Sequence, residues 1–172
     1  MKKIVFALIA VLLLSVPAFA ATKTAYVDLQ KALNLSKAGA QAKSDIAAQA
    51  KEYETEFKIK QGEFLKLKGE LEKQAALLSD TAKQQKIKEY QQSGEALQKF
   101  QKEAQRNLQQ EDGKRTQQIL KELSEILQKF GKDGDYSMII ERSEGGLVYV
   151  AENVDDLTEK LIKAYDASKA KK

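Results

Sequence analysis

Residues 46–78 read IAAQAKEYETEFKIKQGEFLKLKGELEKQAALL, and this stretch decides the fold. It lies within a long segment that contains no proline and is rich in Ala, Lys, Glu, Gln and Leu, all good helix formers. Apolar residues recur at intervals of seven, at Ala50, Phe57, Phe64, Leu71 and Leu78. The complementary heptad position holds Ile46, Tyr53 and Leu67, with Lys60 and Gln74 as interruptions. Two apolar positions per heptad predict the seam of a coiled coil.

A turn is predicted near residues 79–81, where the seam stops. Ser79 or Asp80 can serve as a helix N-cap, because their side-chain oxygens can accept the unpaired amide hydrogens of a new helix. A second apolar series follows: Ile87, Tyr90, Leu97, Ala104, Leu108, Ile119, Leu123, Ile126 and Phe130. The sequence therefore predicts an antiparallel helical hairpin over residues 36–130. The alternative is one uninterrupted helix that pairs with another chain.

The hairpin prediction includes a register between the two arms. With the turn near Asp80, the expected neighbours across the seam are Leu71 and Tyr90, Phe64 and Leu97, Phe57 and Ala104, and Tyr53 and Leu108. Each arm would be roughly 60 to 70 Å long at ~1.5 Å per residue. The arms are interrupted at Gly62, Gly69, Gly94 and Gly113 and by segment 111–118, which has no apolar residue, and each of these glycines costs about 1 kcal/mol relative to alanine. These interruptions indicate either a weakly specified coil or arms that bend.

The first twenty residues predict a cleaved signal peptide, and so an exported protein. Lys2 and Lys3 precede an apolar run, and Ala18-Phe19-Ala20 provides the small residues that signal peptidase recognises. The run is shorter than the ~20 apolar residues of a membrane-spanning helix. No cysteine follows it, which excludes a lipid-anchored lipoprotein.

Composition argues against an enzyme and against a nucleic-acid binder. The chain has no Cys and no His, so thiolate and imidazole chemistry and the commonest metal ligands are absent. We expect no catalytic residues, no metal and no cofactor. The net charge of +4 falls to +2 without Lys2 and Lys3, and lysine and glutamate are interspersed. A nucleic-acid binder would instead concentrate basic charge on one face.

The two ends of the mature chain, residues 21–35 and 131–172, predict a small β-rich body. Residues 24–28 form a predicted strand, and residues 29–33 add a turn or two of helix. Residues 136–141 and 147–150 predict two strands joined through Glu144-Gly145-Gly146 as a hairpin. Asn153 is the expected cap of a final helix. Three short strands and one helix are too few to bury a large core, so we expect self-association to cover them.

These segments, in this order, resemble the Skp/OmpH family of periplasmic chaperones. The resemblance rests on residues 25–33 (AYVDLQKAL), the long Ala/Lys/Glu/Gln-rich hairpin, residues 136–141 (YSMIIE), residues 148–150 (VYV) and residues 153–158 (NVDDLT). It covers essentially the whole mature chain. The resemblance implies a mainly α fold with a small β body, and a homotrimer shaped like a jellyfish, with helical tentacles around a cavity. It also implies a periplasmic, ATP-independent holdase that binds unfolded outer-membrane proteins before they insert.

The resemblance also suggests which residues act. The oligomerisation body would contain Tyr26, Val27, Met138, Ile140, Val148, Val150, Leu157 and Leu161. The hairpin seam, available for client contact if the arms splay, would contain Tyr53, Phe57, Phe64, Leu71 and Leu97. Basic residues near the tentacle tip are Lys73, Lys83, Lys86 and Lys88, which acidic neighbours nearly balance. We therefore do not carry over the family's lipopolysaccharide binding, and expect at most weak membrane-surface contact and no stable membrane insertion. The rival function is a non-catalytic coiled-coil spacer or adaptor of the cell envelope.

Overall fold

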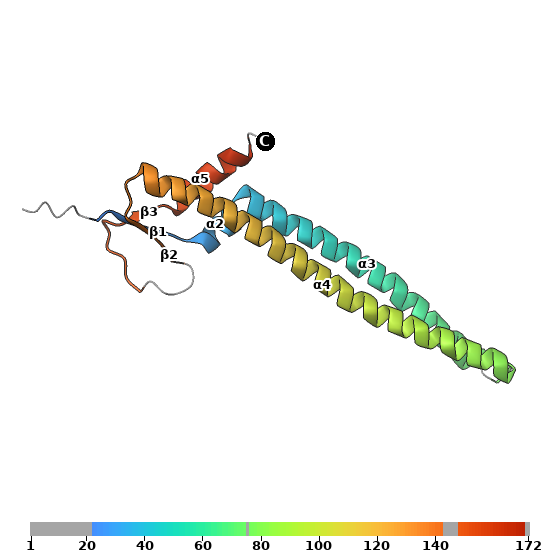
Figure 1. The fold of residues 1–172 in the computed structure, drawn as a ribbon. Coiled ribbons are helices and arrows are strands. Elements are labelled where there is room, and N and C mark those ends of the chain that lie inside the picture. The colour runs from blue at the N-terminus through green and yellow to red at the C-terminus, as the bar shows by residue number, and fades with distance from the viewer. Residues whose placement is uncertain (1–21, 75, 143–147, 171–172) are drawn as a thin grey trace, which may run out of the picture.

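The computed structural model describes residues 22–74, 76–142 and 148–170. The predicted signal peptide therefore lies outside the described residues. A small root, made of strands and short helices, sits at one end of a long arm of two helices (Figure 1). The elements are β1 (Thr24–Val27), α2 (Leu29–Leu35), α3 (Lys37–Gln74), α4 (Asp80–Asp133), β2 (Met138–Glu141), β3 (Asp155–Asp156) and α5 (Thr158–Lys169).

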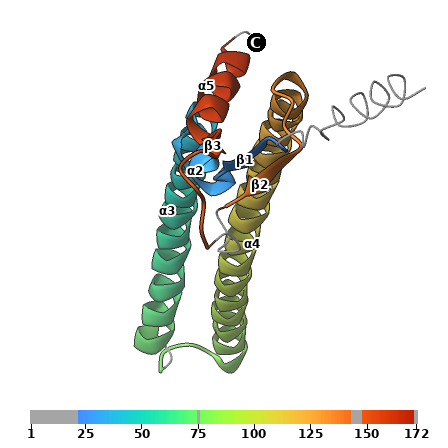
Figure 2. The same cartoon turned by 90° about the vertical axis from the view of Figure 1, so that its left-hand side faces the viewer.

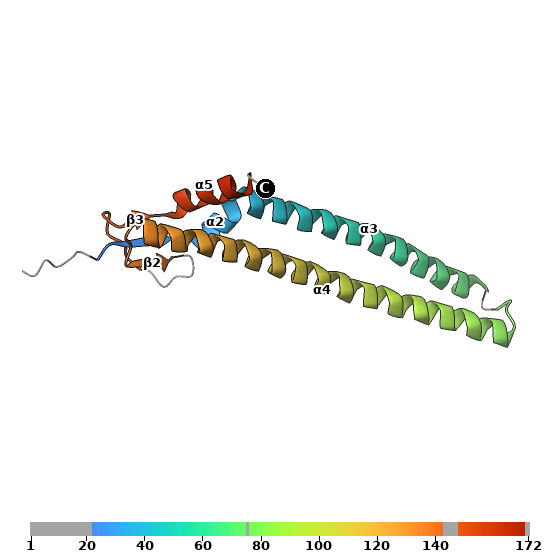
Figure 3. The same cartoon turned by 45° about the horizontal axis from the view of Figure 1, so that its top comes forward.

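Helices α3 and α4 form the arm and lie side by side along most of its length (Figure 3). Ser79 is the N-cap of α4, and its side chain accepts a hydrogen bond from the amide of Ala82. That cap is one of the two predicted. Helix α3 ends at Gln74, four residues before the predicted seam residue Leu78. Helix α3 continues without a break through Gly62 and Gly69, and α4 continues through Gly94 and Gly113, so these glycines do not interrupt the helices.

A sharp corner between α2 and α3 depends on Ser36 and Gly39. The Ser36 hydroxyl is fully buried, donates to the carbonyl of Leu33 and accepts from the amide of Gly39. A β-carbon at position 39 would lie 1.7 Å from the Leu33 carbonyl oxygen. Only glycine therefore fits where the two helices meet.

The sheet is parallel, with strand order β2-β1-β3. Thr24 pairs with Met138 and Val27 with Glu141 in β2, while Ala25 pairs with Asp155 in β3. The prediction that residues 136–141 and 147–150 pair as a β-hairpin is wrong. β2 pairs with β1 and not with residues 148–150, which form no strand; Leu147 and the predicted turn lie outside the described residues. Parallel strands need long crossover connections, and here the whole arm is the crossover between β1 and β2.

The final helix starts at Thr158, not after Asn153 as predicted. Residues 155–156 are held extended as β3, so the helix cannot begin before them. The Asp156 carboxylate accepts the amide hydrogen of Thr158 at 2.8 Å. Burial alone would raise the pKa of Asp156, but hydrogen bonds from Thr158 and Tyr26 outweigh it and lower that pKa.

The core lies in the root, where α2, α5 and the base of α4 cover one face of the sheet. The sheet and α2 sit between α4 on one side and α3 with α5 on the other (Figure 2). The buried cluster consists of Val27, Ala32, Leu33, Ile119, Leu123, Leu161, Ile162 and Tyr165. Self-association is therefore not needed to cover this face of the sheet, because the base of α4 supplies much of the cover within one chain.

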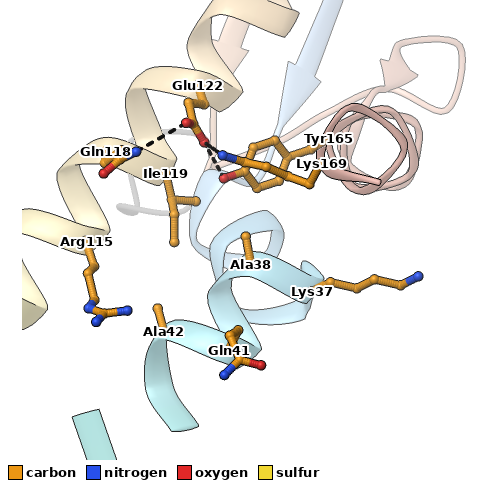
Figure 4. Close-up of a pocket in the computed structure, with 10 residues that line it drawn as sticks. All are labelled: Lys37, Ala38, Gln41, Ala42, Arg115, Gln118, Ile119, Glu122, Tyr165 and Lys169. Atoms are coloured by element: carbon orange, nitrogen blue, oxygen red, sulfur yellow. Dashed lines mark hydrogen bonds and ion pairs between the residues drawn. The ribbon is translucent and has the colours of Figure 1, made fainter. Parts of the chain in front are cut away.

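A charged cluster fixes α5 to α4 at the edge of this core (Figure 4). The Glu122 carboxylate accepts hydrogen bonds from the Tyr165 hydroxyl and the Lys169 ammonium, both at 2.6 Å. Burial alone would raise the pKa of Glu122, but these two donors outweigh it and hold the pKa below its ordinary value. Burial, and then the hydrogen bond that its hydroxyl donates to Glu122, raise the pKa of Tyr165.

We predict that Glu122 makes the root acid-sensitive. Because its pKa is lower in the folded chain than in the unfolded chain, its contribution to stability is present above about pH 4.3 and is lost as the pH falls through the folded value. Glu122→Gln should lower the urea midpoint at neutral pH. The midpoint of this variant should also decrease less than that of the wild type as the pH is lowered. Urea unfolding from about pH 7 to pH 3 measures this. Glu125→Gln, at an exposed site three residues along α4, is the matched control and should behave like the wild type.

Two glycines of the arm should respond differently to alanine. A β-carbon at Gly62 meets nothing within 4 Å, whereas one at Gly94 would lie 3.1 Å from Cε2 of Phe64. We expect Gly62→Ala to raise the free energy of unfolding by about 0.5–1 kcal/mol through helix propensity alone. Gly94→Ala should give none of this gain. Thermal and urea unfolding followed by circular dichroism compare the two, and equal gains would show that Phe64 does not pack on Gly94.

Candidate functional site

The arm carries the seam residues that the sequence singled out. Phe64 of α3 stacks on Tyr90 of α4, with ring centroids 4.7 Å apart and planes at 19°. Tyr53 meets Phe100 edge to face at 6.0 Å. The close approach of Phe64 to Gly94 shows why a residue without a side chain suits that position. These aromatic contacts join the two helices through the middle of the arm.

The predicted register between the arms is wrong by about one to two helical turns near the aromatic stack. Tyr90 was expected opposite Leu71 and Phe64 opposite Leu97, but Phe64 lies on Tyr90. Helix α3 ends at Gln74 and α4 begins at Asp80, so the midpoint between the two helices comes earlier in the chain than Asp80, which the prediction took as the midpoint. The displacement is not uniform, because the Tyr53 hydroxyl accepts a hydrogen bond from the side-chain amide of Asn107, the residue next to its predicted partner Leu108.

The seam remains open to solvent along the arm. Tyr53, Phe57, Phe64, Leu71 and Leu97 are all half-buried, and none is part of the buried core. Beyond the root, Ala104 is the one apolar residue of the described arm that is buried. Apolar side chains elsewhere on α3 are exposed singly, with Ile59 at 59% and Leu65 at 56%. The arm therefore has large apolar side chains with unused contact surface.

Two ion pairs cross between the helices on one side of the arm. Arg115 of α4 binds Asp45 of α3 at 2.7 Å, and Lys86 binds Glu70 at 3.1 Å. Hydrogen bonds from Gln41 and then Arg115 lower the pKa of Asp45. The hydrogen bond to Glu70 raises the pKa of Lys86. Both pairs are solvent-exposed at their edges, so they fix the lateral position of the helices more than they stabilise the fold.

The four tip lysines do not form one basic cluster. Lys86 forms ion pairs with Glu70 at 3.1 Å and with Glu89 at 3.8 Å. Lys73, Lys83 and Lys88 are exposed and make no ion pair among the described residues. One of the four predicted residues is thus part of the contact between the helices, and the others are solvated.

A cavity of about 420 Å³ lies where the arm joins the root (Figure 4). Small residues of α3 face α4 here, so the two helices leave a space between them. The lining residues are Lys37, Ala38, Gln41, Ala42, Arg115, Gln118, Ile119, Glu122, Tyr165 and Lys169. Its floor is apolar and its charged rim is largely paired, through Arg115 with Asp45 and Lys169 with Glu122. It can admit an apolar side chain but does not select for charge.

The residues predicted for the oligomerisation body fall into two groups. Val27, Leu157 and Leu161 are buried in the core of the single chain, with at most 3% of their surface exposed. Tyr26, Met138 and Ile140 lie on the other face of the sheet, because side chains alternate along a strand. Of these, Met138 is 55% exposed.

The predicted strand residues Val148 and Val150 are not in the sheet, which corrects their assignment. Val148 is 97% exposed and Tyr149 81%, and residues 148–152 and 154 line a small cavity beside Tyr26 and Arg142. Among the described residues, no strand of the same chain pairs with them. The outer face of the sheet and this segment together form an exposed apolar surface, which we call the outer sheet surface.

Several residues that matter were missed at the sequence level. The ion pairs Asp45–Arg115 and Glu70–Lys86 depend on the register between the helices, which heptad spacing alone did not fix. Glu122 and Tyr165 are brought together from positions 43 residues apart. For Gly94 a signal existed, because a glycine on the seam side of a helix indicates that a bulky neighbour packs there.

In the described part of the chain, no three acidic residues gather closely enough to hold a metal ion. None of the described helices has an apolar stretch of the length needed to cross a bilayer.

Comparison with known proteins gives one family and one fold. A model of the family described as Outer membrane protein (OmpH-like) matches residues 23–165. Comparison with curated protein sequences finds no match. A crystal structure from Caulobacter crescentus CB15, of a protein suggested in its description to be an outer membrane chaperone (OmpH-like), has a TM-score of 0.77. The alignment covers 87% of this chain and 86% of that chain at 17% identity, so it establishes a shared fold. Since the family model spans most of the chain, this protein belongs to the OmpH-like family.

Proposed function

We propose that this protein is an ATP-independent holdase chaperone that binds unfolded outer-membrane β-barrel proteins in the periplasm and prevents their aggregation. Membership of the OmpH-like family and the chaperone named in the description of the Caulobacter structure support this proposal. So does the sequence of residues 1–20, which predicts export. The site residues on the arm would act by contact and not by chemistry.

The observation that carries the proposal is the open seam. Large aromatic and aliphatic side chains run along the arm, yet none of the five predicted seam residues is fully buried. An unfolded barrel strand exposes alternating apolar side chains and unpaired backbone groups, which make it prone to aggregate. Half-buried aromatics offer such a strand many weak contacts, so the client is held without being fixed in one conformation.

The proposal includes a homotrimer held together by the outer sheet surface, with three arms around a shared cavity. Val148, Tyr149 and Met138 are large apolar side chains exposed in the single chain. Contiguous exposed apolar surface is typical of an association site. The trimeric stoichiometry is taken from the family resemblance, whereas the location of the association surface is inferred from the exposed apolar residues.

One observation favours the second candidate function, an envelope spacer or adaptor. Helices α3 and α4 run unbroken through the glycines, as a stiff spacer would require. A spacer has no need of unused aromatic surface, whereas a holdase does. The open seam therefore favours the holdase.

The holdase proposal predicts that the purified mature protein suppresses aggregation. A urea-unfolded β-barrel protein diluted into buffer should scatter less light when the protein is present in stoichiometric amounts, without ATP. The seam variant Phe57→Ser, combined with Tyr53→Ser, should weaken this suppression because it removes apolar contacts. The control is Glu54→Ser with Lys58→Ser, two exposed polar sites that pair with each other on the same helix. Undiminished scattering with the wild type would favour the spacer.

The assembly proposal predicts that two apolar-to-aspartate changes act differently. Ile140→Asp lies on the outer sheet surface, so it should leave the helical circular dichroism intact and yield smaller species in sedimentation velocity. Val27→Asp buries a charge in the core of the single chain and should destabilise the fold itself. An assembly that survives Ile140→Asp would show that the copies associate through another surface.

A further inference from the structure

One side of helix α3 carries a regular row of acidic side chains. The row follows intervals of seven, four, seven and seven residues: Asp45, Glu52, Glu56, Glu63 and Glu70. At about 100° per residue, these intervals keep all five within a sector of about 40° around the helix. The first and last members each pair with a cation of α4, Arg115 and Lys86. The row therefore runs along the edge of the seam, and we call it the acidic row.

Two members of the acidic row have no cation beside them. In the middle of the row, Lys60 pairs with Glu56 at 3.4 Å, four residues away on the same helix. With the two end pairs, this leaves two of the five carboxylates. Glu52 and Glu63 are exposed and form no ion pair among the described residues. They are unoccupied positions in a row whose other members each hold a cation.

Lys60 shows what fits between the acidic row and the seam. Its ammonium lies 3.4 Å from the Glu56 carboxylate and 5.2 Å from the ring centre of Phe100 on α4. Phe100 in turn meets Tyr53 edge to face. A cation is attracted to an aromatic face because the ring quadrupole makes that face negative. The arm thus already seats one lysine side chain between a carboxylate and an aromatic ring of the seam.

The two unoccupied carboxylates have aromatic neighbours of the same kind. Glu52 directly precedes Tyr53, and Glu63 directly precedes Phe64, whose ring stacks on Tyr90. The three rings are half-buried, so part of each aromatic surface is accessible. Each place offers a carboxylate for a charged group and aromatic surface for the apolar stem that carries it.

We propose that Glu52 with Tyr53, and Glu63 with Phe64, bind lysine or arginine side chains of an unfolded client where these lie beside apolar residues. This inference rests on the holdase of the proposed function, and it names the client segments that the arm favours. Lys60 is then a resident competitor, because it occupies the place that a client cation would take at Glu56 and Phe100.

The preference is local and runs against the overall charge of the protein. The net charge of +4 is still +2 without Lys2 and Lys3, so long-range attraction alone favours acidic clients. Exposed acidic residues also occur on the side of α3 opposite the acidic row. There Glu54 and Glu72 are paired with lysines of their own helix. Unpaired carboxylates next to seam aromatics distinguish the acidic row from that side.

Acetylation of the client's lysines tests the inference. A fluorescently labelled, urea-unfolded β-barrel protein is diluted into the full mature protein, and the affinity is measured by anisotropy before and after acetylation. Acetylation makes the client more apolar and more acidic, so apolar contact and overall charge both predict tighter binding. The acidic row predicts binding about three- to tenfold weaker. Equal or tighter binding of the acetylated client would overturn the inference.

Two matched double variants locate the effect. Glu52→Gln with Glu63→Gln should bind the unmodified client about three- to tenfold more weakly and should no longer distinguish it from the acetylated one. Glu54→Gln with Glu72→Gln makes the same change in net charge, about 180° from Glu63 around the same helix. This control should discriminate as the wild type does. Equal effects of the two variants would mean that general charge, and not the acidic row, sets the affinity.

The resident lysine gives a test of opposite sign. Lys60→Gln frees Glu56 and the ring of Phe100, so it should tighten binding of the unmodified client and leave the acetylated client unchanged. Lys58→Gln is the control, because Lys58 is also paired with a glutamate four residues before it. An equal response to both lysine changes would remove the role of Lys60 as a competitor.

The same client separates failure of this inference from failure of the proposed function. A mature protein that neither binds the unfolded client nor suppresses its aggregation overturns both. A protein that suppresses aggregation, but whose affinity is unaffected by acetylation and by the acidic-row variant, overturns the inference alone. The holdase then binds through apolar contact without preference for basic segments.

Discussion

The packing of the base of α4 against α5 and β1 is the contact on which the rest of the structure depends. Leu123, Leu161 and Tyr165 are almost completely buried there, together with Val27. Beyond the root the described arm buries no large apolar side chain. The arm is therefore anchored at one end, and the Glu122 cluster with Tyr165 and Lys169 reinforces this anchor. A long arm of marginal internal packing can project from the molecule only because its base is secured.

The arm combines continuous helices with an incompletely covered seam. Aromatic stacking of Phe64 on Tyr90 and the ion pairs at Asp45 and Glu70 hold the helices in register, and both rings remain partly exposed. This arrangement suits a surface that exchanges contacts with a mobile client.

The residues predicted for the body lie on opposite faces of the sheet, and the two faces contact different surroundings. Alternation along β1 turns Val27 into the core and Tyr26 outward. Met138 and Ile140 follow Tyr26 through the parallel register of β1 and β2. The sequence pattern does not separate these two groups, because periodicity identifies apolar positions without saying which partner covers them. The division rests on strand pairing over more than 100 residues of sequence.

The sequence by itself determined the helical class, a helix cap at Ser79 or Asp80 and the apolar positions of the arm, because helix propensity, capping and heptad spacing act between residues close in the chain. Only the tertiary structure decided the parallel order of the sheet, the register that stacks Phe64 on Tyr90, and the late start of α5 at Thr158. Each of these depends on partners distant in sequence. The propensity of one segment does not determine which distant segment it contacts. Packing, hydrogen bonds and the length of the connection between Gln74 and Asp80 determine these contacts.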